Sequence, residues 1–378
     1  MKQQNRVDAI DFWRGCVLCM IFVDHMPGNA LENLTPRNFG FSDAAEAFVF
    51  LSGVSLAVAY GGRFFLGQRL QTLRGLAKRE LKLYGAHIGL SLAGLIIFFA
   101  GAAWMGKPGL LEVHGRDLFV DNPGLGVLGL VSLGHQLGYF NILPLYIILI
   151  AFVPVLLWLA AIDRRAMLGA SALVYALFRL SGWNIPSWPT PGAWFFDPFA
   201  WQLLFAIGLA VGLDLRNASV PRSRPLMVVA ALIVAASGAV VTRGFGLGAH
   251  ADGWQSVREA LDLDKAQLGL VRLIHFLALA YLIYGLRLTD RLRNCSLYGP
   301  AALLGRHSLW VFALLSLFSA IWQVLVAAVT PTIWLDATFL VASLAIIYLA
   351  TRRIDADSVV GSQPAGVGGM APAQSGSR

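Results

Sequence analysis

The chain has 378 residues, of which 57% are hydrophobic and only 13% are charged. This composition excludes an ordinary soluble domain, in which about a quarter of the residues carry a charge. The 29 Lys and Arg residues exceed the 21 Asp and Glu residues. Since no basic run is interleaved with exposed aromatic residues, nucleic acid is not an expected partner.

Apolar segments long enough to cross a bilayer recur along the chain, separated by polar loops that contain turn residues. They predict an all-α fold, a polytopic transmembrane helix bundle of about ten spans. Nineteen Lys and Arg residues fall in one set of alternate loops, which includes both termini, and six fall in the other set. Because basic loops stay in the cytoplasm, both termini are predicted to be cytoplasmic. The predicted segments are 10–27, 43–60, 84–104, 140–160, 166–180, 198–213, 226–242, 268–286, 308–328 and 336–350.

Residues 1–353 are predicted to form one transmembrane domain. The remaining segment, 354–378, is rich in Gly, Ser, Pro and Ala, and it is predicted to be a disordered cytoplasmic tail. In the longest outer loop, the Gly-rich, apolar residues 124–139 fit either a segment that dips into the membrane or a simple surface loop. The first apolar segment is too polar for a cleavable signal peptide, so it is expected to remain in the mature chain.

The first span carries four ionisable residues, Asp11, Arg14, Asp24 and His25. Such groups cost several kcal/mol inside a membrane and indicate a functional site. Arg14 and His25 are eleven residues apart, so they share one face of a helix and lie roughly 16 Å apart along its axis. Asp11 is placed to pair with Arg14 at the i,i+3 spacing. The structural alternative is an Arg that reaches one membrane interface and a hydrogen-bonded His at the other.

Two cysteines of the same span, Cys16 and Cys19, form a CxxC motif. No second cysteine pair completes a tetrahedral metal site, so they are interpreted as small buried hydrophobic residues, and no metal is expected.

The second span opens with Asp43 and Glu46, three residues apart, which is the spacing of a capping box. A structural role therefore has at least as much support as a catalytic one. Both carboxylates nevertheless fall at the same predicted depth as His25, where a carboxylate can fix the tautomer of an imidazole and raise its basicity.

Three later places carry polar residues in or beside apolar segments. Each is a candidate for substrate binding, although a lone amide more often joins two helices. The residues are Arg272 with His275 in the eighth span, Arg306 with His307 at the start of the ninth, and the amides Asn141 and Gln202 at span starts.

Several segments resemble a known family. Arg14 and His25 with ten residues between them, the segment 48–53 (FVFLSG) and the segment 305–310 (GRHSLW) are similar to the membrane acyltransferase-3 superfamily. Five further segments in order resemble the OpgC family, which is named for adding succinyl groups to osmoregulated periplasmic glucans of Gram-negative bacteria. They are DHMPG (24–28), RNFGFSDAAE (37–46), NILPLY (141–146), FDPFAWQ (196–202) and RLIHFLAL (272–279).

This resemblance implies a multi-pass O-acyltransferase of the bacterial inner membrane. It implies acyl-CoA, with succinyl-CoA expected, as a co-substrate rather than a bound cofactor, and a periplasmic glucan or other glycan as the acceptor. On that basis Arg14 holds an anionic group of the donor, His25 takes the proton of the attacking hydroxyl, and Asp24 positions it. Arg272, His275, Arg306 and His307 are expected to contact donor phosphates or the developing oxyanion.

Alternatives remain open. In one alternative, the enzyme transfers an acetyl or another acyl group to a different surface glycan. In a reading from another class, the chain is a small-molecule transporter whose path is lined by Arg14 and His25. Transfer is either direct or passes through an acylated serine, for which Ser52 and Ser308 are the candidates.

Overall fold

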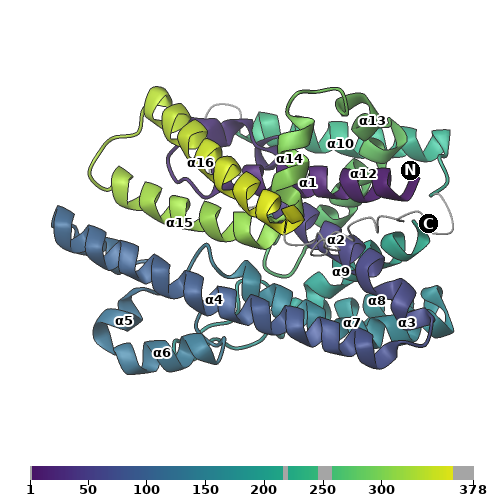
Figure 1. Cartoon of the computed structure of the whole chain (residues 1–378), viewed down its shortest axis with the longest axis horizontal. Coiled ribbons are helices and arrows are strands. Elements are labelled where there is room, and N and C mark those ends of the chain that lie inside the picture. Colours follow the sequence, from purple (N-terminus) through teal and green to yellow (C-terminus); the bar gives the residue numbers. More distant parts are fainter. Residues whose placement is uncertain (1, 216–219, 246–257, 361–378) are drawn as a thin grey trace, which may run out of the picture.

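The computed structural model describes residues 2–215, 220–245 and 258–360, and this part of the chain is a bundle of helices without a named β-strand (Figure 1). Every segment predicted to span the membrane falls on a helix of this bundle. The long helices are α1 (Lys2–Asp24), α2 (Ala44–Leu56), α4 (Arg69–Met105), α7 (Ile142–Ile162), α8 (Arg164–Ser181), α9 (Pro198–Asp214), α10 (Arg224–Phe245), α12 (Leu270–Gly285), α15 (Ser308–Val326) and α16 (Ile333–Val360).

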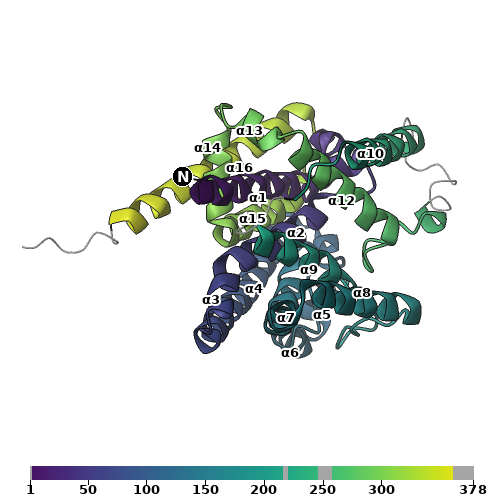
Figure 2. The same ribbon diagram turned by 90° about the vertical axis from the view of Figure 1, so that its right-hand side faces the viewer.

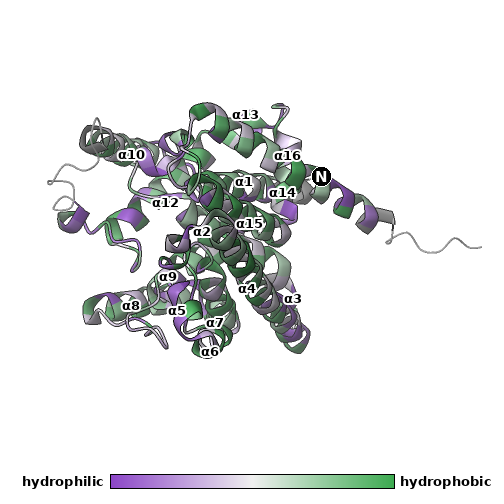
Figure 3. Ribbon diagram, turned by 90° about the vertical axis from the view of Figure 1, so that its left-hand side faces the viewer, coloured by the Kyte–Doolittle hydropathy of each residue, from purple (hydrophilic) through white to green (hydrophobic). Residues whose placement is uncertain are grey.

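Within the described ranges, six helical segments are both long enough and apolar enough to cross a membrane. They lie on α2 with its continuation, α4, α7, α10, α15 and α16, while α9 and α12 are shorter apolar helices. The chain is therefore an all-helical membrane protein, and the count of ten spans stays a prediction. Hydrophobic residues make up most of the long helices (Figure 3).

Short helices connect or extend the long ones. A π-helical turn (Ala57–Gly61) joins α2 to α3 (Gly62–Phe65). The long loop between α4 and α7 folds into a 3-10 turn (Pro108–Leu111), α5 (Asp117–Asp121) and α6 (Pro123–Val131). The segment between α1 and α2 contains two 3-10 turns, Ala30–Leu34 and Pro36–Asn38. On the other side of the bundle, α13 (Leu288–Leu292) and α14 (Tyr298–Arg306) precede α15.

The helix boundaries follow from local chemistry. The side chain of Asp163 accepts a hydrogen bond from the backbone N–H of Arg165 at the start of α8, and Asp197 does the same for Phe199 at the start of α9. These bonds satisfy N–H groups that have no partner within the helix. The last helix continues to Val360, so residues 354–360 belong to α16 rather than to the predicted tail. The rest of that tail, 361–378, lies outside the described residues.

α1 lies among other helices, with contacts to α14, α2 and α15 (Figure 2). Its contact with α14 is made backbone to backbone, because a Cβ atom at Gly15 would overlap the carbonyl of Ala301. Such close approach of two helices requires glycine at the crossing point. On its other side α2 packs against α9, so α2 lies between the α1 group and the group formed by α4, α7, α8 and α9.

The helices of the bundle run between two ends. The N-terminal end holds Asp8, Arg293 and Asp355, and the opposite end holds residues 24–43, 106–141 and 182–197. Asp8 pairs with Arg293 at 3.6 Å, which places the start of α1 beside α13. Asp355 pairs with Arg306 at 3.3 Å, which brings the end of α16 to the same side through α14.

Candidate functional site

The side chain of Arg14 lies inside the bundle, about 18 Å along α1 from its first residue. One guanidinium nitrogen donates a hydrogen bond to the hydroxyl of Ser308, and Nη1 lies 4.0 Å from Oδ1 of Asp11, the predicted i,i+3 partner. The guanidinium Nε is buried without a hydrogen-bond partner among the described residues. Arg14 therefore lies in the interior of the bundle rather than at its end, because α1 begins twelve residues before it.

A second arginine approaches the same place from α4. Nη2 of Arg79 donates to the hydroxyl of Tyr146 at 2.9 Å, and its guanidinium lies 5.8 Å from the centre of that ring. The charge of Arg79 acts on Arg14, and so does the Tyr146 hydroxyl. Two cations are thus brought near one another inside the bundle, and Asp11 is the carboxylate within salt-bridge distance of Arg14. We call Arg14, Arg79, Tyr146 and Ser308 the arginine cluster.

His25 follows directly after α1, at the opposite end of the bundle. Its ring meets the ring of Tyr139 edge to face at 4.9 Å, and Tyr139 also contacts the ring of His114 at 5.0 Å. In the part of the chain that the structure describes, no side chain or backbone group hydrogen-bonds to the imidazole of His25. The residue as a whole is half-buried.

Burial tunes the residues around Tyr139. It raises the pKa of the Tyr139 phenol, which therefore stays neutral near pH 7. It lowers the pKa of His114, and the nearby charge of Arg116 adds to that effect. The guanidinium of Arg116 is itself buried against the ring of Phe98 at 3.8 Å, and burial lowers its pKa to about 10.

Asp24 turns away from His25. Its Oδ1 accepts a hydrogen bond from the hydroxyl of Thr35 at 2.6 Å and lies 3.5 Å from Nε of Arg37. Arg37 also donates to Glu32 at 2.8 Å. Asp24 therefore holds the segment between α1 and α2 in place. Among the described residues, its carboxylate does not hydrogen-bond to the imidazole of His25.

Asp43 and Glu46 form the predicted capping box at the start of α2. They are also ion-paired with two basic residues from distant parts of the chain. Arg272 of α12 donates from Nε to Glu46 at 2.8 Å and from Nη2 to Asp43 at 3.2 Å, and Nζ of Lys265 lies 2.7 Å from Asp43. Glu46 is completely buried. We call these four residues the carboxylate network, in which two negative and two positive charges are balanced.

The carboxylate network lies near His25 without bonding to it. The charges of Lys265 and Asp43 both act on the imidazole, with opposite sign. His275, one turn after Arg272, is bonded instead to Ser42, whose backbone N–H and hydroxyl lie 3.2 Å and 2.8 Å from Nδ1. These contacts favour a structural role for Arg272 and His275, and their predicted substrate contacts stay predictions.

The remaining predicted residues do not contact His25 in the described structure. Arg306 and His307 lie at the N-terminal end, where His307 is 2.8 Å from Asp355. Gln202 of α9 donates to the backbone carbonyl of Ser171 in α8 at 2.7 Å, which joins two helices. Asn141 lies at the opposite end and lines a hollow between two loops.

Three residues of the site could not be recognised as functional candidates from the sequence around them. Lys265 lies in a loop, Arg79 is one of several basic residues before the apolar part of α4, and Tyr139 precedes Asn141 in an irregular segment. Each acquires its place only through tertiary contacts with a residue far along the chain.

The fold and these clusters define a polytopic helical membrane protein with ionisable groups buried at two depths. Its sequence matches the OpgC protein family over residues 6–357, and the chain belongs to that family. Membership indicates an acyltransferase of the glucan succinyltransferase kind. No curated protein and no solved structure matched the chain significantly.

Proposed function

We propose that this protein transfers an acyl group, succinyl in the first instance, from cytoplasmic acyl-CoA to a hydroxyl of a periplasmic glucan, and that it does so in the inner membrane of a Gram-negative bacterium. One observation carries the proposal. Arg14 of the arginine cluster lies within α1, in the interior of the bundle, and His25 follows directly after that helix at the opposite end. No described residue hydrogen-bonds to the His25 imidazole, which packs on Tyr139. This arrangement suits two substrates that arrive from different sides.

The arginine cluster provides the donor site. Arg14 and Arg79 place two positive charges near each other, and the buried Nε of Arg14 still has a hydrogen to donate. An anionic group bound there relieves the repulsion between the cations and supplies the missing acceptor. A carboxylate or a phosphate of the donor fits these requirements. Arg306, whose side chain is 53% exposed at the N-terminal end, is available to a more distant phosphate.

His25 acts as the general base. The acceptor oxygen forms a bond to the carbonyl carbon of the thioester while His25 takes the hydroxyl proton, and the C–S bond then breaks. The proton passes from His25 to the departing thiolate, so the imidazole returns to its neutral form. Edge-to-face packing on Tyr139 holds the ring in one orientation without consuming either nitrogen.

The carboxylate network keeps the start of α2 in register with α12 beside His25. Its charges cancel locally, so it provides a fixed electrostatic background rather than a proton donor. Ser308 is bonded to Arg14 and Ser52 is buried in α2, and neither lies against a base in the described structure. Direct transfer therefore has more support than a route through an acylated serine.

The test uses the full chain in lipid nanodiscs with radiolabelled succinyl-CoA and a purified periplasmic glucan. Label is expected to appear on the glucan, with acetyl-CoA in parallel as the competing donor. Arg14→Ala is expected to raise the KM for the donor about tenfold or more, with a smaller effect on the KM for the glucan. Unchanged acylation of every glycan in a strain that lacks the gene, compared with its parent, would sink the proposal.

A further inference from the structure

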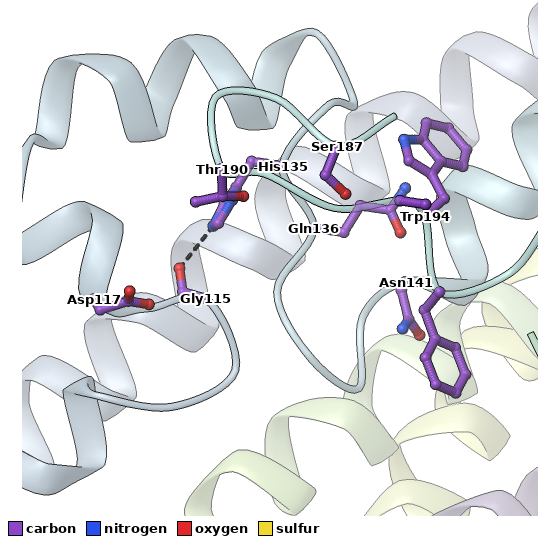
Figure 4. A pocket seen from close by; sticks show the side chains of 10 residues that line it. Gly115, Asp117, His135, Gln136, Asn141, Ser187, Thr190 and Trp194 are labelled. Atoms are coloured by element: carbon purple, nitrogen blue, oxygen red, sulfur yellow. Dashed lines mark hydrogen bonds between the residues drawn. The ribbon is translucent and has the colours of Figure 1, made fainter. Parts of the chain in front are cut away.

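A hollow of about 280 Å³ opens between two loops at the same end of the bundle as His25. One wall comes from residues 115–117 and 135–141, and the other from residues 187–195 (Figure 4). Nε2 of His135 donates to the carbonyl of Gly115 at 2.7 Å, which holds the first wall together. The backbone N–H of Trp188 donates to the carbonyl of Gly134 at 3.1 Å, which joins the two walls. The hollow is therefore a built feature rather than a gap between loose segments.

The lining carries the groups that recognise a neutral, hydroxyl-rich ligand. The amides of Gln136 and Asn141 and the hydroxyl of Ser187 each both donate and accept hydrogen bonds. Trp194 is 6% exposed, and its indole N–H has no acceptor among the described residues. A buried donor without a partner is costly and indicates a missing acceptor.

The hollow also has an apolar surface and little charge. Phe195 is 49% exposed and lines it together with Trp194, while Asp117 is the one charged residue in the lining. A volume of about 280 Å³ is at the small end of ligand sites. These properties fit a single sugar ring, which has one apolar face and a rim of hydroxyls, better than an anion or a lipid tail.

The hollow is linked to His25 through Tyr139. Tyr139, whose ring touches His25, lies two residues before Asn141, and two residues span at most about 7 Å. On the same wall, His114 contacts the same tyrosine and directly precedes Gly115. Tyr139 therefore connects His25 to the wall of the hollow that contains Gly115 and Asn141.

We infer that this hollow is a binding subsite for one sugar ring of the acceptor glucan, adjacent to the unit whose hydroxyl is acylated at His25. The inference rests on the proposed function for the identity of the acceptor. The subsite holds the polymer by a neighbouring unit, with Trp194 donating to a sugar oxygen and Phe195 packing on the apolar face of the ring. The reacting unit is then left free to approach the imidazole.

Binding is measured without turnover, by isothermal titration calorimetry of the full-length His25→Ala chain in nanodiscs with a purified linear gluco-oligosaccharide. In this background Phe195→Ala is expected to weaken binding about fivefold, because the apolar packing surface is lost. Trp194→Phe, which keeps a ring and removes the N–H, and Gln136→Ala are each expected to weaken it roughly threefold. The matched control is Trp104→Ala, since Trp104 is 88% exposed near the end of α4 and is not among the residues that line the hollow.

The inference is overturned if the three hollow variants bind the oligosaccharide as tightly as their parent, or if the His25→Ala chain does not bind it at all. The melting temperature of each variant shows whether it has folded, and Phe195, being exposed, is the variant least dependent on the core. Failure of the proposed function gives a different result. In that case the oligosaccharide binds and responds to the hollow variants, but the wild-type chain transfers no acyl group to it.

Discussion

His25 and the carboxylate network lie at the same end of the bundle and carry ionisable groups at similar depth, yet their surroundings differ. Glu46 is completely buried and receives a guanidinium, and its side chain also closes the capping box. His25 is half-buried, and its imidazole is packed on Tyr139. The carboxylate of Glu46 thus has its partners within the protein, whereas the imidazole of His25 has no hydrogen bond to a described residue.

This difference separates two reasons for placing an ionisable residue in a membrane protein. A buried carboxylate is tolerated when its charge is neutralised and its oxygens are bonded, and its removal then damages the fold. A base that must accept a proton from a substrate needs a free nitrogen instead, and its removal damages the reaction. The comparison therefore predicts opposite outcomes for mutations of His25 and of Arg272.

The largest effect is expected for His25→Ala. The rate of acyl transfer should fall by a factor of about 10² to 10⁴, which is the range for loss of a general base, while the melting temperature changes little. Radiolabel transfer and thermal unfolding of the same nanodisc preparation measure the two quantities. His114→Ala is the matched control, because it removes another imidazole from the same tyrosine ring. Equal loss in both variants would mean that packing on Tyr139, not proton transfer, is what His25 supplies.

Arg272→Ala reverses this pattern. It leaves the buried carboxylate of Glu46 without its partner, so we expect a loss of about 3–5 kcal/mol in the free energy of unfolding. The double variant Arg272→Met with Glu46→Gln should recover part of that loss, because no uncompensated charge then remains. A single variant as stable as the wild type would show that the network is not structural.

A smaller effect is expected for Gln202→Ala, which removes a buried hydrogen bond between α9 and α8. The carbonyl of Ser171 loses its side-chain partner, and the free energy of unfolding should fall by about 1–2 kcal/mol with transfer retained. Gln71→Ala on the exposed surface of α4 serves as the control. A large loss of acyl transfer at unchanged stability would instead support the predicted role of Gln202 in substrate binding.

The smallest effect is expected for Asp355→Asn at the N-terminal end. Its partner Arg306 is largely exposed, and exposed ion pairs contribute less than about 1 kcal/mol because water and salt screen them. Chemical denaturation at low and high salt measures the difference, which should shrink as salt is added. A loss as large as that of Arg272→Ala would remove the distinction between buried and exposed pairs in this protein.

The sequence predicted what depends on neighbours along the chain. Apolar length located the helices, and spacing alone gave the capping box of Asp43 and Glu46 and the pairing of Asp11 with Arg14. The family followed from ordered motifs and is confirmed by the match over residues 6–357.

Pairings between distant residues could not be predicted in this way. Lys265 is 222 residues from Asp43, and Arg272 is 226 residues from Glu46, so nothing local indicated that these charges meet. The hollow is likewise formed by two loops that are separate in sequence. The end of α16 was misplaced for the same reason, since Asp355 lies where the hydropathy falls but is held by Arg306 and His307.

The contact of Gly15 with the backbone of α14 has a consequence for the choice of donor. With no side chain between the two backbones, α1 has little room to slide or rotate past α14. The distance of roughly 16 Å between Arg14 and His25 along α1 is then fixed. Under the proposed roles of Arg14 and His25, a donor bound at Arg14 would bring its thioester to His25 only if the distance between its anionic group and its sulfur matched this length.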